Sequence, residues 1–177
     1  MNTFMDLALR RQSCRSFTGE PVSHALLEKI IEAARQTPSA CNSQPWRFAV
    51  AESPEAVAQV AQAGQQLGIN GFLAKASAFI VILEAHAVLM QRLRVCIDSQ
   101  YFARADIGAA MVSVCYAATD LGLGSCIIGL YDREKIANAL DIPIEQPISA
   151  LIAIGVPETD TVRAKSRKPL EEIVRYK

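Results

Sequence analysis

The sequence predicts a single domain, an α/β sandwich in which helices cover both faces of a central sheet. Three observations predict it. Four short apolar runs have the length of strands, and they are continuous rather than alternating, as is typical of strands buried on both faces. Segments with apolar residues at helical spacing separate these runs. The 177 residues suffice for one core, and they contain no internal repeat.

Two helices are expected first. Residues 3–9 place apolar side chains on one face, and Ser23 is a good N-cap for a second helix that Pro38 ends. The stretch SACNSQPWRF, residues 39–48, then crowds short hydrogen-bonding side chains next to the only tryptophan, before a strand at residues 47–51. Because Trp46 stands at the start of that strand, we expect it in the core.

The middle of the chain predicts two more helices around a buried strand. A serine cap and a proline at the first helical position begin a helix at residues 53–67, and the run AFIVIL, residues 78–83, is the strand. A longer helix over residues 97–121 stops at Gly122. Its small residues permit close approach of another helix, either from a second copy of the chain or from packing within one subunit.

The last third predicts strands at residues 125–129 and 148–155, with a helix beginning at Asp132 between them and a short amphipathic tail at the end. The glycines of GLGS lie after a helix and before a strand, which is the reverse of the order in a dinucleotide-binding turn, so they are interpreted as a helix stop. The sequence contains no P-loop, HExxH or GxSxG motif.

Composition excludes several classes of function. Eighteen basic and eighteen acidic residues give no net charge, so no long-range field directs the protein to nucleic acid or to acidic lipid. No apolar run reaches the roughly 18 residues of a membrane span. Five cysteines without a CxxC pair, and an N-terminus unlike a signal peptide, predict a reducing, cytoplasmic location. The two histidines are too far apart for a zinc site, so we expect no metal. A hydrophobic content of 51% predicts a subunit interface.

Two basic loops carry the strongest chemical signal. RRQSCR occupies residues 10–15 and RAKSRK occupies residues 163–168. Guanidinium forks, an ammonium and hydroxyls are the groups that bind a phosphate. Either run alone would more often be a solvated loop. Two runs of this composition at opposite ends of a neutral chain predict that they meet around one anion.

Four blocks of the sequence carry a family resemblance: ALRRQSCRSF, PSACNSQPWRF, DLGLGSCIIGLYD and GVPETDTVRAKSRKPLEEIV. In this order and spacing, over nearly the whole chain, they resemble the nitroreductase family of FMN-dependent oxidoreductases. The resemblance implies one α+β domain over residues 1–177, with a mostly antiparallel or mixed sheet. It also implies an intertwined homodimer with two FMN molecules in clefts at the interface, each contacted by both subunits.

The resemblance further implies which residues bind FMN. Arg11 and Ser13 would face the phosphate and ribityl chain, and Arg15 would face the pyrimidine edge. Asn70 fits the pattern loosely, and a turn residue is its alternative role. The implied cofactor-binding residues of one subunit are Arg11, Gln12, Ser13, Arg15, Asn70, Gly129, Leu130, Lys165 and Arg167, and those of the other are Pro38, Ser39 and Asn42.

The implied reaction moves hydride from NAD(P)H to the flavin and then electrons to a nitroaromatic, quinone or similar acceptor, by a ping-pong mechanism. It needs no side-chain nucleophile, and Arg15 would support the reduced flavin electrostatically. Two alternatives remain. One is another FMN reaction, such as reductive dehalogenation or flavin breakdown. The other is a non-enzymatic module whose basic loops bind nucleic acid or another polyanion, which the neutral charge and the 6% aromatic content disfavour.

Overall fold

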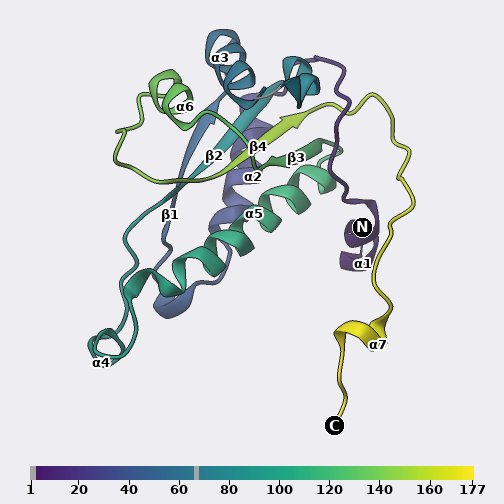
Figure 1. Ribbon diagram of the computed structural model, residues 1–177. Coiled ribbons are helices and arrows are strands. Elements are labelled where there is room, and N and C mark those ends of the chain that lie inside the picture. The colour runs from purple at the N-terminus through teal and green to yellow at the C-terminus, as the bar shows by residue number, and fades with distance from the viewer. Residues whose placement is uncertain (1–2, 66–67) are drawn as a thin grey trace.

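The computed structural model describes residues 3–65 and 68–177 (Figure 1). Its centre is a four-stranded sheet in the order β1-β2-β4-β3, and each neighbouring pair is antiparallel. An isolated parallel bridge joins Ser13 to Ser125 at the edge of β3. The expectation of a mostly antiparallel sheet is confirmed. The strands are β1 Trp46–Ala51, β2 Ala78–Glu84, β3 Gly124–Ile128 and β4 Ile148–Gly155.

Helix starts follow their caps. Thr3 forms a capping box with Asp6, and the side chains of Ser53 and Asp132 accept hydrogen bonds from backbone amides of the first turn. Ser23 occupies the N-cap position without a side-chain cap bond. The helices are α1 Phe4–Arg10, α2 His24–Arg35, α3 Pro54–Gly64, α4 Gln91–Arg94, α5 Ala103–Asp120, α6 Arg133–Ala139 and α7 Leu170–Ile173, with 3-10 turns at Ala40–Asn42, Gly71–Lys75 and Ser99–Tyr101.

Both faces of the sheet are covered, as the continuous apolar strands predict. Along β2, Phe79 and Val81 pack in one cluster with α3 and α6, whereas Ile80 and Ile82 pack in another with α2 and α5. These helix pairs lie on opposite sides of the strands in Figure 1. Trp46 is buried in the second cluster, so its expected core position is confirmed. The sheet therefore supplies a rigid edge on which loops can be placed.

The predicted start of the long helix is wrong. It begins at Ala103 rather than residue 97, because the preceding residues form α4 and a 3-10 turn. Asp98 accepts from the backbone amide of Gln100 at 3.1 Å, and the Gln100 side chain accepts from the amide of Ala87 at 2.5 Å. These local bonds compete with helix. The helix expected over residues 53–67 is described as far as Gly64, and its expected last two residues lie outside the described part of the chain.

A membrane-spanning helix and a cluster of metal ligands are both absent from the described residues. Across residues 3–65 and 68–177, no helix combines the length and apolarity that a bilayer crossing needs. Within the same ranges no three potential metal ligands from histidine, cysteine, aspartate and glutamate gather in one place. All five cysteines are free thiols.

Candidate functional site

The first basic loop, residues 10–15, is called the N-terminal basic segment below, and it lies across the end of the sheet. The backbone amide of Cys14 donates to the Ser125 carbonyl at 2.8 Å, and further along Phe17 forms a bridge with Pro157. Two strand-end glycines make this close approach possible. A Cβ at Gly124 would lie 2.7 Å from Cys14 Sγ, and one at Gly155 would lie 2.8 Å from Phe17 Cδ1. Both distances are shorter than a Cβ tolerates, so any other residue would force the side chain of Cys14 or Phe17 to move.

The second basic loop, residues 163–168, is called the C-terminal basic segment below, and it lies against the N-terminal basic segment. Gln12 Nε2 donates to the Thr161 carbonyl at 2.9 Å, and Gln12 Oε1 accepts from the backbone N and the side-chain Nε of Arg163, each at 3.2 Å. Arg163 Nη2 donates to the Ser13 carbonyl at 2.5 Å. Lys165 Nζ donates to the Ala8 carbonyl at 2.6 Å, at the C-terminal end of α1. Segments about 150 residues apart in sequence thus meet in space.

Three cations gather where the segments meet. Burial lowers the pKa of Lys165, and the charges of Arg11 and Arg167 lower it further. In the described chain, no carboxylate forms an ion pair with any of the three. Like charges held together without counter-ions repel each other. An anion placed among them would relieve that repulsion, so the cluster of Arg11, Lys165 and Arg167 is suited to bind one.

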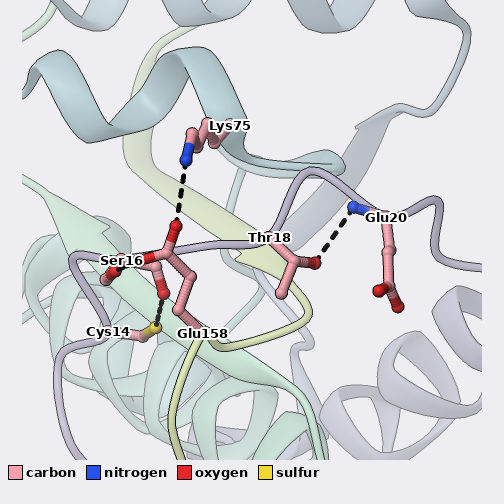
Figure 2. A network of polar contacts seen from close by, with 6 residues as sticks. All are labelled: Cys14, Ser16, Thr18, Glu20, Lys75 and Glu158. Atoms are coloured by element: carbon pink, nitrogen blue, oxygen red, sulfur yellow. Dashed lines mark hydrogen bonds and ion pairs between the residues drawn. The ribbon is translucent and has the colours of Figure 1, made fainter.

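A second polar network holds the other end of the N-terminal segment (Figure 2). Ser16 Oγ donates to Glu158 Oε2, and Lys75 Nζ lies 2.9 Å from Glu158 Oε1. The hydrogen bond from Ser16, followed by the bond and charge of Lys75, lowers the pKa of the Glu158 carboxyl. Cys14 Sγ donates to the Ser16 carbonyl at 3.2 Å, while burial raises the pKa of this thiol and so keeps it protonated. The backbone on both sides of Arg15 is therefore fixed.

A cavity of about 510 Å³ adjoins these contacts. Its walls are formed by residues 10 and 12–16, by residues 119 and 122–124 around the end of α5 and the start of β3, and by residues 157 and 159–163. Three of the predicted residues line it, namely Gln12, Ser13 and Arg15. Arg10 and Arg163 line it as well, and Arg10 Nη2 is buried with no hydrogen-bond partner among the described residues. A second cavity of about 560 Å³, between α2 and β1, contains none of the predicted residues.

The other predicted residues lie outside the first cavity. Leu130 is exposed beyond β3, next to Gly129. Asn70 adopts a left-handed conformation with φ of 62°, and its side-chain amide donates to the Gly64 carbonyl at 3.2 Å, which is the behaviour of a turn residue. Pro38, Ser39 and Asn42 do not line the first cavity within one chain either. The three cations Arg11, Lys165 and Arg167 also lie outside its lining, so the structure places the cation cluster next to the cavity and not in its wall.

The loop that holds Ser39 and Asn42 is strained. Cys41, Asn42 and Gln44 all have positive φ, between 48° and 53°. Side-chain bonds hold it: Ser39 Oγ accepts from the amide of Gln44 at 2.9 Å. Non-glycine residues in this conformation are uncommon and tend to gather at functional sites. The short hydroxyls of SACNSQPWRF thus hold a fixed loop shape.

Comparison with known proteins places the chain in a family. The model of the Nitroreductase family matches residues 8–156. The chain belongs to the nitroreductase family. A Thermus thermophilus protein named NADH dehydrogenase is 30% identical, with 96% of this chain and 94% of the relative covered. The Bacillus subtilis FMN reductase [NAD(P)H] is 29% identical over 98% of this chain and 73% of its own length.

A solved structure from Desulfovibrio desulfuricans extends the likeness to the fold. It is described as a proposed nitroreductase in complex with FMN, and it is 25% identical with a TM-score of 0.77. The match covers 100% of this chain and 98% of that one. The α+β fold with a four-stranded antiparallel sheet is thus a nitroreductase-family fold, and this chain is an enzyme of that family.

Sequence reasoning missed some residues that build the site. Arg163 belongs to the basic run RAKSRK but is not among the residues that the family resemblance implies, and no sequence pattern indicates that Glu158 and Lys75 form an ion pair. Gly124 and Gly155 stand at strand ends, where their need for a missing Cβ depends on a segment far away in sequence. A glycine at the end of an apolar run was the available hint.

Proposed function

We propose that this enzyme binds FMN and uses it to pass electrons from NAD(P)H to nitroaromatic, quinone or similar acceptors. The observation that carries the proposal is the cluster of Arg11, Lys165 and Arg167, which has no carboxylate partner in the described chain. A phosphate monoester carries close to two negative charges and three acceptor oxygens, which suits guanidinium and ammonium donors. A neutral flavin without phosphate would leave these charges unbalanced.

The chain's own residues have distinct roles in this proposal. Arg11, Ser13, Lys165 and Arg167 hold the phosphate end, and the bond from Lys165 to the Ala8 carbonyl orients the ammonium. Arg15 faces the pyrimidine edge, where its fixed positive charge stabilises negative charge that develops on reduction. Bound FMN supplies the two-electron chemistry, which allows hydride donor and acceptor to use the site in turn by a ping-pong mechanism.

The same proposal includes a homodimer in which Pro38, Ser39 and Asn42 of one copy complete the site of the other. Three features support it. Strand β1 pairs only with β2, so its outer edge is free to pair within the described chain. Helix α1 exposes Phe4 and Leu9. The tail also exposes Ile173 and Tyr176, and it extends away from the sheet in Figure 1. Several exposed apolar side chains on one helix and one tail are typical of an interface between subunits.

An absorbance spectrum of the purified protein, recorded before and after NADH or NADPH under anaerobic conditions, tests the function. We expect flavin bands that bleach with one or both nucleotides and return when a quinone or nitroaromatic is added. Protein that stays colourless after incubation with FMN would overturn the proposal, and salt-dependent binding of RNA by such protein would favour the non-enzymatic alternative. Sedimentation tests the dimer separately: a monomer with stoichiometric FMN would contradict the shared site.

A further inference from the structure

Arg163 lies at the junction of the two basic segments but outside the residues assigned to FMN. We propose that Arg163 is a positioning residue, which acts through Gln12 to fix the distance between Arg11 and the pair Lys165 and Arg167. By doing so it sets the preference of the site for FMN over riboflavin, the same flavin without a phosphate. This inference rests on the proposed function.

The hydrogen bonds form a clasp, defined as the side chains of Gln12 and Arg163 with their partners. One amide, that of Gln12, accepts twice from Arg163 and donates once to the Thr161 carbonyl. Arg163 Nη2 adds a fourth bond, to the Ser13 carbonyl. Because the clasp contacts the backbone of both segments, it fixes their relative position rather than that of one side chain.

The guanidinium of Arg163 is bonded within the clasp. The groups that lower the pKa of Lys165 after burial are Arg11 and Arg167, and Arg163 is not among them. Arg163 instead acts on the thiols of Cys14 and Cys126, whose pKa values its charge lowers against the larger effect of burial. Its Nε and Nη2 are already used by Gln12 and Ser13. Two of the three side-chain nitrogens of Arg163 thus bond within the clasp, while the residue also lines the cavity.

The C-terminal arm, residues 158–177, has few other restraints near the clasp. Residues 158–164 are all exposed, so little apolar burial holds them against the N-terminal segment. Without the clasp, repulsion among the three cations would favour their separation, and a phosphate would have to order the arm on binding. Riboflavin has no phosphate, so its binding does not require the three cations to lie close together. Loss of the clasp, with its charge-assisted bonds, should therefore weaken the binding of FMN by about tenfold and leave the binding of riboflavin unchanged.

Titrations of the full-length protein with FMN and with riboflavin test the inference in four variants. Arg163→Met removes the clasp, and Arg163→Lys keeps the charge without the planar fork. The double variant Gln12→Ala with Arg163→Met tests whether the two side chains act together. Glu158→Gln is the matched control, because it weakens the other tether between the same two segments while leaving the clasp intact.

We expect the ratio of riboflavin Kd to FMN Kd to fall about tenfold in Arg163→Met and in Arg163→Lys, and to stay unchanged in Glu158→Gln. The double variant should be no worse than Arg163→Met. An unchanged ratio in Arg163→Met, or equal weakening of both flavins, would overturn the inference, as would recovery of the ratio in Arg163→Lys, which would indicate direct charge contact. Wild-type protein that binds neither flavin would instead refute the proposed function.

Discussion

The sheet and the C-terminal arm, residues 158–177, are held by different forces. Strand β4 lies between two others, and its last six residues are buried. In the arm every residue is exposed except Lys165, which is half-buried. The sheet is stabilised by apolar burial on two faces, whereas the arm is held by hydrogen bonds from a few polar side chains. The comparison teaches that the fold is independent of the site's cations, and that the site depends on contacts which the core does not enforce.

The largest expected effect lies in the sheet. Ile152→Ala removes a fully buried side chain from the centre of β4 and should lower the free energy of unfolding by about 2–5 kcal/mol, because a cavity remains. Ile144→Ala makes the same chemical change at a side chain that is 56% exposed and should cost no more than about 0.5 kcal/mol. Chemical denaturation of both variants measures the difference. Equal losses would contradict the distinction between core and surface.

A substitution in the arm should have the opposite pattern. Lys165→Met removes a charge that lies close to Arg11 and Arg167, so we expect FMN to bind about 10–100-fold more weakly while the flavin-free protein stays as stable or becomes slightly more so. Flavin fluorescence titration and thermal unfolding measure the two quantities. Lys168→Met, an exposed change in the same segment, is the control. Equal FMN affinities in the two variants would remove Lys165 from the phosphate site.

A substitution at Arg15 tests the N-terminal basic segment, which joins the sheet to the C-terminal arm. Arg15→Ala should retain FMN but lower the flavin reduction potential by about 30 mV or more, because the positive charge that stabilises the reduced flavin is lost. A spectroelectrochemical titration measures the potential. Arg133→Ala on α6 removes a guanidinium of equal charge that does not line the cavity and that donates to the Ile144 and Gln146 carbonyls, and it should leave the potential unchanged. A wild-type potential in Arg15→Ala would exclude the electrostatic role.

The smallest expected effect lies far from the arm, between α2 and β1. His24 Nδ1 is 2.8 Å from Glu52 Oε2, and this hydrogen bond, with the charges of Glu52 and Glu28, raises the pKa of His24 above its ordinary 6.5. A raised pKa gives stability that is fully present below pH 6.5 and is lost as the pH rises through the folded-state value. His24→Gln should therefore lower Tm at acidic pH, by no more than about 2 °C, and should match wild type at alkaline pH. A difference that grows toward alkaline pH would show the opposite sign of coupling.

Much of the sheet region could be predicted from the sequence. The apolar run at residues 148–155 coincides with β4, and the predicted caps Ser23, Ser53 and Asp132 all stand at helix N-caps. These features depend on neighbours in sequence. The predicted start of α5 was wrong because the Gln100 side chain forms hydrogen bonds to the backbone of Ala87 and Ala85, which no local sequence pattern reveals. The candidate site divides in the same way: its two basic runs were visible, but the clasp between them was not.

The sequence by itself determined where the four strands and most of the helices lie, and which two segments carry phosphate-binding side chains, because propensity and periodicity act over a few residues. Only the tertiary structure decided that Arg163 binds Gln12, that Gly124 and Gly155 must lack a Cβ, and that Lys165 lies beside Arg11. Those facts join residues about 100 to 150 positions apart, and such pairings are set by the packing of the whole chain.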